Sequence, residues 1–244
     1  MYLLLSGEGT GDMGICKPTA YRCERDHFEE GPMAIIIDQL IEYFQGYEMS
    51  HLETQRVSYV SEKFLSDNRQ PPLKKAMSLR GKKKPPETKY FYENARTLAS
   101  VAKEISAEIG DKVIAILFRD ADGTASANRG HWEHKRQSMI EGFKAEDYEL
   151  GVAMVPKPKS EAWLLCATKD NPYQHCAELE NESGNDDSTR PPLKDQLRDS
   201  LNGNSSKEEL NRLLMEHIID IHRIDMPSFE TFKADLQNVI DKAL

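Results

Sequence analysis

The feature that most constrains the fold is the run 113–118 (VIAILF), six consecutive apolar residues in a chain that is 30% charged. A strand of this composition is buried on both faces, as in the centre of a parallel sheet. Three further apolar runs, at 2–5, 57–60 and 151–155, are predicted to be its neighbouring strands. Because helical patterns alternate with these runs, the sequence predicts an α/β fold: a mostly parallel, Rossmann-like sheet with helices on both faces.

Two segments show the apolar spacing of amphipathic helices. From Met33 to Phe44 and from Phe91 to Ile109, apolar residues recur at steps of three and four, and a glycine follows each segment. Between the first strand and the first helix, the polar and charged segment 16–31 is predicted to be a loop. Further helices are expected at 131–143, 160–167, 193–201, 207–222 and 228–244.

These patterns divide the chain into two parts. Residues 1–168 form the predicted core, with a basic insertion near 69–89, and residues 169–244 form a mainly helical C-terminal extension. No run approaches the roughly 18 apolar residues of a membrane span, and the first residues lack the basic segment of a signal peptide. We therefore expect a cytoplasmic protein without a membrane partner. The four cysteines are too few for a disulfide framework in 244 residues and are predicted to be free thiols.

The charge is concentrated unevenly along the chain. The whole chain carries −9, but segment 69–89 holds eight basic residues and one acid, which leaves −16 on the remainder. This pattern predicts an acidic body with one arm that contacts a polyanion, and the alternative is a solvated loop. The arm residues expected to follow a nucleic-acid backbone are Lys74, Lys75, Arg80, Lys82, Lys83 and Lys84.

Acidic side chains follow three of the predicted strands. Glu8 and Asp12 come after the first strand, Asp120 and Asp122 after the third, and Glu161 opens the helix after the fourth. The carboxyl ends of parallel strands meet at one edge of the sheet, where α/β proteins bind ligands. Carboxylate oxygens are the ligands that Mg²⁺ prefers, so these five residues are predicted metal ligands. The alternative is that they form turns and helix caps.

Two segments resemble the Toprim (topoisomerase–primase) domain. They are 4–12 (LLSGEGTGD), with its Glu-Gly-x-x-Asp pattern, and 114–122 (IAILFRDAD), in which an apolar strand ends in Asp-x-Asp. The segment 155–165 (VPKPKSEAWLL) resembles short Toprim-like proteins of bacterial defence loci, which are akin to the nuclease domain of overcoming-lysogenization-defect proteins and are often found beside an ATPase. The segment 226–232 (MPSFETF) resembles the tail of the same family. The resemblance is good over 1–168 and loose beyond it.

The resemblance implies a nuclease that hydrolyses phosphodiesters with Mg²⁺ or Mn²⁺. Glu8, Asp120 and Asp122 would be its catalytic residues, and Glu8 is either a ligand or the base that moves a proton. Lys157 and Lys159 are expected to neutralise the scissile phosphate. The resemblance further implies anti-phage defence, an ATPase partner, and DNA rather than RNA as substrate; a homo-oligomer is also expected. The segment 16–31 and the basic arm are longer than the minimal domain needs, so the substrate channel does not follow by analogy.

Two other functions remain open from the sequence. Segment 120–124 (DADGT) also resembles the first motif of haloacid-dehalogenase-type phosphatases, in which Asp120 would be the nucleophile and Asp122 the acid/base. Against this, a strand–helix unit precedes the motif, and no later apolar strand ends in paired aspartates. The other alternative is a non-catalytic partner or regulator of an ATPase, in which the acidic cluster is only structural.

Overall fold

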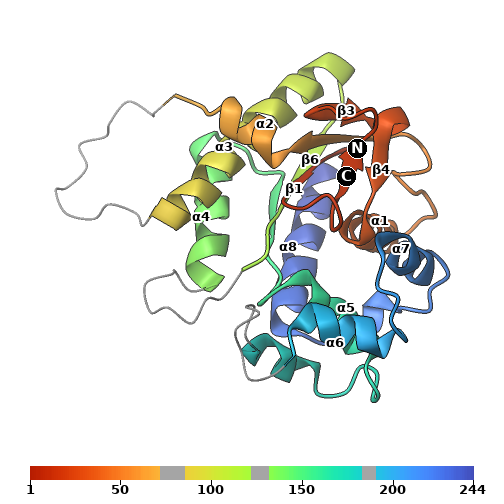
Figure 1. The fold of residues 1–244 in the computed structure, drawn as a ribbon. Coiled ribbons are helices and arrows are strands. Elements are labelled where there is room, and N and C mark those ends of the chain that lie inside the picture. Colours follow the sequence, from red (N-terminus) through yellow and green to blue (C-terminus); the bar gives the residue numbers. More distant parts are fainter. Residues whose placement is uncertain (72–85, 122–131, 183–190) are drawn as a thin grey trace.

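The computed structural model describes residues 1–71, 86–121, 132–182 and 191–244, and its centre is a five-stranded sheet in the order β3-β5-β1-β6-β7 (Figure 1). β1 (Tyr2–Gly7) pairs in parallel with both β5 (Val57–Ser61) and β6 (Val113–Phe118). β7 (Gly151–Met154) pairs in parallel with β6, and the short β3 (Arg22–Glu24) is antiparallel to β5. The four predicted strands and the mostly parallel sheet are thus confirmed.

The prediction of a loop at 16–31 is wrong. This part of the chain contains β3, the 3-10 turn η1 (Arg25–His27) and β4 (Phe28–Glu30), which pairs with β2 (Gly14–Cys16). The strands have three residues each, and β3 buries only its central Cys23. Three residues are too few to show a periodic apolar pattern, and these strands are held by pairing, β2 with β4 and β3 with β5.

The helices follow the predicted spacing with two differences. The observed elements are α1 (Pro32–Gln45), α2 (Glu62–Asp67), α3 (Pro86–Ile109), α4 (Trp132–Ala145), α5 (Ser160–Thr168), η2 (Cys176–Asn181), α6 (Leu193–Ser200), α7 (Lys207–Met215), η3 (Ile221–Arg223) and α8 (Pro227–Ala243). α2 was not predicted. α7 ends well before residue 222, because His217 adopts a left-handed conformation with φ 54° that a helix cannot contain.

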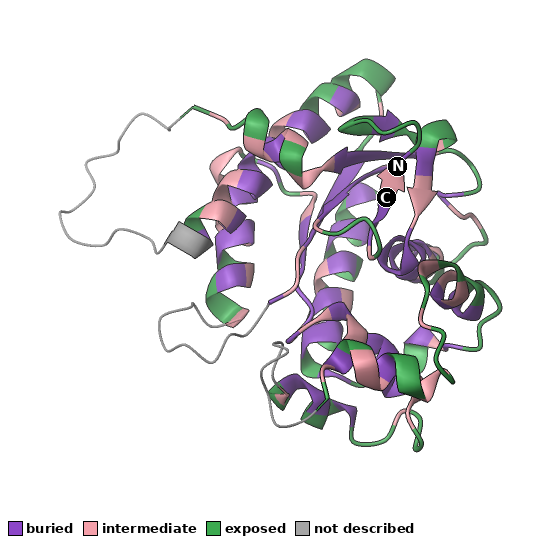
Figure 2. Ribbon diagram, viewed as in Figure 1, coloured by how far each residue is buried: buried purple, intermediate pink, exposed green. Residues whose placement is uncertain are grey.

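The strands of the central sheet are mostly buried (Figure 2), and their side chains alternate into two cores. Leu3 and Leu5 of β1 lie in the core beneath α1, α5 and α8, whereas Leu4 lies in the core beneath α3 and α4. In β6, Ile116 and Leu117 divide in the same way. The result is a sheet between two helical layers, as the sequence predicts.

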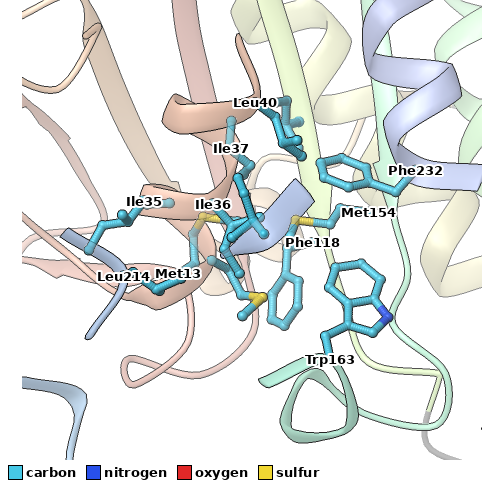
Figure 3. Close-up of a cluster of buried hydrophobic side chains, with 14 of the residues drawn as sticks. Met13, Ile35, Ile36, Ile37, Leu40, Phe118, Met154, Trp163, Leu214 and Phe232 are labelled. Carbon is cyan, nitrogen blue, oxygen red and sulfur yellow. The ribbon is translucent and has the colours of Figure 1, made fainter. Parts of the chain in front are cut away.

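The C-terminal part of the chain helps to build the first core. α8 packs against β6, β7 and α1, and its Phe229 and Phe232 contact the ring of the fully buried Trp163. Figure 3 shows Phe232 and Trp163 beside Met154 and Phe118 of the sheet. The predicted parts 1–168 and 169–244 therefore share one core.

The prediction of free thiols is wrong. Disulfides join Cys16 to Cys23 and Cys166 to Cys176. The fold brings the Cα atoms of the two pairs to 5.8 and 5.2 Å, which a cysteine count cannot reveal. Disulfides persist mainly in oxidising compartments, so they do not favour the predicted cytoplasmic location. That location stays a prediction. Among the described helices, none combines the length and the apolar character needed to cross a membrane.

The path of the chain defines where this sheet is open to a ligand. From β1 the chain crosses through α1 to β5 on one side, and it then crosses the other face through α3 to β6 on the opposite side of β1. The two crossovers leave the carboxyl ends of β1 and β6 flanked by helices on different faces. This is the topological switch point at which α/β sheets bind ligands.

Candidate metal centre at the carboxyl edge of the sheet

Glu8 and Asp120 meet at this switch point. Glu8 directly follows β1 and Asp120 comes two residues after β6, and the backbone N–H of Asp120 donates to Glu8 Oε1 at 2.8 Å. The parallel pairing of β1 with β6, in register from Tyr2–Val113 to Gly7–Phe118, brings the two residues together across 112 positions of sequence. The convergence expected from the strand ends is confirmed for this pair.

Asp12 and Glu161 complete a cluster around Ser160, the first residue of α5. The Ser160 backbone N–H donates to Asp120 Oδ1 at 2.9 Å, and its hydroxyl donates to Asp12 Oδ1 at 2.7 Å. The same hydroxyl lies 3.4 Å from Glu161 Oε2. Ser160 is 1% exposed and was not predicted as a site residue, although its place at the start of a predicted helix was an available signal.

The electrostatics of the cluster are unfavourable for four negative charges. Burial raises the pKa of Asp120 well above its usual value, and the carboxylates of Asp12, Glu161 and Glu8 raise it further. The pKa of Asp12 is also raised, first by burial, although the hydrogen bond from Ser160 opposes the shift. Hard oxygen donors that repel one another in a partly buried place match a divalent cation such as Mg²⁺ or Mn²⁺.

Arg119 lies on the other side of Glu8. Its Nε is 3.2 Å from Glu8 Oε2, and its guanidinium also hydrogen-bonds Glu62 at the start of α2. The same group lies 4.5 Å from the ring centroid of Tyr90 and 5.1 Å from that of Phe91. Arg119 was not predicted, although it stands beside Asp120 in sequence, because its partners come from three distant segments.

A buried lysine supports the end of β6. Lys135 of α4 is 1% exposed, donates from Nζ to the carbonyl oxygen of Ala121, and lies over the Phe91 ring. Lys135 lies in the helix predicted at 131–143, but it was not predicted as a buried or functional residue. Its hydrogen bond holds the backbone at Ala121, directly after Asp120.

The remaining predicted residues are only partly placed. Lys157 is 37% exposed in its side chain, with Nζ 3.9 Å from Glu180 Oε2, and Lys159 is half-buried and close enough to lower the pKa of Asp12. Asp122 lies outside the described residues, so its roles as metal ligand and as phosphatase acid/base stay predictions. The same holds for the arm residues Lys74, Lys75, Arg80, Lys82, Lys83 and Lys84.

The carboxylate oxygens of this cluster are of the type that binds Mg²⁺, but their arrangement among the described residues does not form a metal site. Across the described ranges, no three His, Cys, Asp or Glu side chains are grouped so that they could hold an ion. One oxygen of Asp120 accepts a hydrogen bond from Ser160. The two oxygens of Glu8 contact the Arg119 guanidinium and the Asp120 backbone N–H.

Comparisons with family models, curated proteins and solved structures found no match for this chain.

Proposed function

We propose that the protein is a metal-dependent phosphodiesterase that cleaves nucleic acid. The observation that carries this proposal is the direct hydrogen bond between Asp120 and Glu8 at the switch point of the sheet. Two acidic residues from different strands meet at the position where α/β proteins bind their ligands. The proposal retains the Toprim-like character and the cytoplasmic location inferred from the sequence.

Each residue of the cluster has a part in this proposal. Glu8, Asp120 and Asp122 would hold Mg²⁺ or Mn²⁺, and Asp12 and Glu161 lie close enough to Asp120 to add charge. A bound ion of this kind lowers the pKa of a water and stabilises the charge that develops on the phosphate. Ser160 orients the carboxylates of Asp12 and Asp120 through its two hydrogen bonds. Glu8 is either a ligand or the group that takes the proton of the attacking water.

The proposed substrate is DNA. Lys157 and Lys159, on the segment between β7 and α5, would neutralise the phosphate that is cleaved. The arm at 69–89 would follow the backbone of the nucleic acid without reading its sequence, which makes binding sensitive to salt. An ATPase partner, a homo-oligomer and a role in anti-phage defence complete the proposal.

The test is cleavage of plasmid and single-stranded DNA with Mg²⁺ or Mn²⁺. We expect wild-type protein to cut, Asp120→Asn and Glu8→Gln to lose the activity, and chelation of the metal to abolish it. Asp111→Asn is the matched control, because it makes the same change at the other end of β6. Equal cleavage by all four proteins would assign the activity to a contaminant or to a different site.

One observation favours a second function, a non-catalytic partner or regulator of an ATPase. Arg119 already neutralises Glu8, and the described side chains form no ready-made metal site. In that case the acidic residues hold α5 against the sheet. Calorimetric titration with Mn²⁺ separates the two functions: the nuclease binds the ion and Asp120→Asn does not, whereas the regulator binds none.

A further inference from the structure

A separate groove lies at the opposite end of α1. The first turn of α1 is next to Asp12, because the Met33 backbone N–H donates to the Asp12 carbonyl oxygen at 2.9 Å. The 14 residues of α1 extend roughly 20 Å from there. Its last turns and the segment that follows α7 enclose a groove of about 310 Å³. α1 and α7 lie side by side in Figure 1.

Two exposed tyrosines form the apolar part of the groove. Tyr43 is 63% exposed and Tyr47 is 49% exposed, values that are high for rings of this size. The centroid of the Tyr43 ring lies 4.5 Å from that of the His222 ring, and the two rings are tilted by 46°. The faces of such rings carry negative potential and attract cations.

The polar part of the groove consists mainly of acceptors. Glu42 and Glu48 line it, and neither forms an ion pair with a residue in the described part of the chain. Gln39 donates its amide N–H to the Leu214 carbonyl oxygen at 2.9 Å, while its own Oε1 is buried without a hydrogen-bond donor. Among the lining residues that the structure describes there is no lysine or arginine, and the basic side chains are those of His217 and His222.

We propose that this groove binds a lysine or arginine side chain from a basic segment of a partner protein. Two carboxylates would pair with the cation, and the faces of Tyr43 and Tyr47 would contact it. Tyrosine is also enriched among the residues that dominate protein interfaces. Charge complementarity selects this occupant, because the lining offers the carboxylates of Glu42 and Glu48 and the ring faces of Tyr43 and Tyr47. The site is remote from the acidic cluster at Glu8 and Asp120, so it does not depend on the proposed nuclease activity.

The experiment uses the full chain and two fluorescein-labelled octapeptides, one of alternating glycine and arginine and one of alternating glycine and glutamate. Fluorescence anisotropy measures binding at low salt. We expect the arginine peptide to bind and the glutamate peptide not to bind. The double variant Glu42→Gln/Glu48→Gln should weaken binding about tenfold, and Tyr43→Leu or Tyr47→Leu about two- to fivefold each.

The matched control is Glu104→Gln/Glu108→Gln, which removes two exposed glutamates from α3 in the other helical layer. It makes the same change in net charge, and its affinity for the arginine peptide should stay unchanged. Thermal unfolding followed by circular dichroism checks that each variant is folded. The proposal is overturned if the groove variants bind like wild type, if the control loses as much affinity, or if no peptide binds at millimolar concentration.

Discussion

Asp111 and Asp120 stand near the two ends of the same strand, β6, and their surroundings move their pKa values in opposite directions. Asp111 accepts a hydrogen bond from the N-terminal ammonium at 2.7 Å, which lowers its pKa, and Arg56 adds to the effect. Asp120 is buried among Asp12, Glu161 and Glu8, and its pKa is raised well above the usual value. The acid near the amino end of β6 thus lies beside positive charges, whereas the acid near its carboxyl end lies among other carboxylates.

The ionised form of Asp111 stabilises the folded protein, whereas the ionised form of Asp120 destabilises it. A carboxylate beside two cations contributes to stability wherever it is ionised. A carboxylate buried among other carboxylates costs stability in the ionised form, and such arrangements cluster at functional sites. The cost at Asp120 is offset in part by the hydrogen bond from the Ser160 backbone. Substitutions at the two ends of β6 should therefore have opposite consequences.

The largest effect is expected for Asp120→Asn. We expect Mn²⁺-dependent DNA cleavage to fall at least about 100-fold, because loss of a residue that only supports a ligand already costs 10- to 100-fold. The melting temperature measured in chelator should stay unchanged or rise, since the amide still accepts the Ser160 N–H and no longer repels the neighbouring acids. Cleavage rates and thermal unfolding are measured on the same preparation. A fall in both would mean that Asp120 serves mainly to hold α5.

The sequence was sufficient to predict the carboxyl end of β6 because its signals are local. The apolar run 113–118 predicts a central strand, and the position of Glu8 after another strand predicts the convergence with Asp120. Helices with strong apolar spacing, such as α1, were equally accessible. For β6 and α1, the pattern of buried residues follows directly from the order of apolar side chains in the sequence.

What the sequence did not predict depends on contacts between distant segments. Arg119 is positioned by its contacts with Glu62 and Tyr90. Lys135 is buried against the carbonyl oxygen of Ala121 and the ring of Phe91. The cysteine pairs form because short strands and turns bring them together, not because of their number. No local periodicity encodes such contacts, so charged residues in these positions looked like ordinary surface residues.

The second prediction concerns the amino end of the sheet and its fully buried His51. The pKa of His51 is lowered to about 4, first by burial and then by the N-terminal ammonium and Arg56, whereas Asp111 opposes them. The Asp38 carboxylate lies 3.9 Å from Nδ1, and neither ring nitrogen has a hydrogen-bond partner among the described residues. The unfolded chain therefore binds the proton more readily, so stability is complete above pH 6.5 and is lost as the pH falls toward 4.

The measurement is the free energy of unfolding in urea from pH 7 to pH 4 for wild type and for His51→Phe, which cannot titrate at this position. We expect wild type to lose on the order of 3 kcal/mol relative to the variant over this range. The comparison cancels the other groups that titrate. A difference between the two proteins that does not change with pH would show that His51 is not the group responsible.

The smallest effect is expected for Asp111→Asn. The Asp111 carboxylate and the Arg56 side chain are partly exposed, so we expect a loss of about 0.5–1 kcal/mol and a fall of about 1–4 °C in melting temperature. High salt should reduce the difference from wild type, because it screens an exposed pair. Arg56→Gln in the same background should add less than its separate effect, since both changes break one pair. DNA cleavage should remain at the wild-type rate. If Asp111→Asn instead stabilised the protein or abolished cleavage, the two ends of β6 would not differ in the way that their charges indicate.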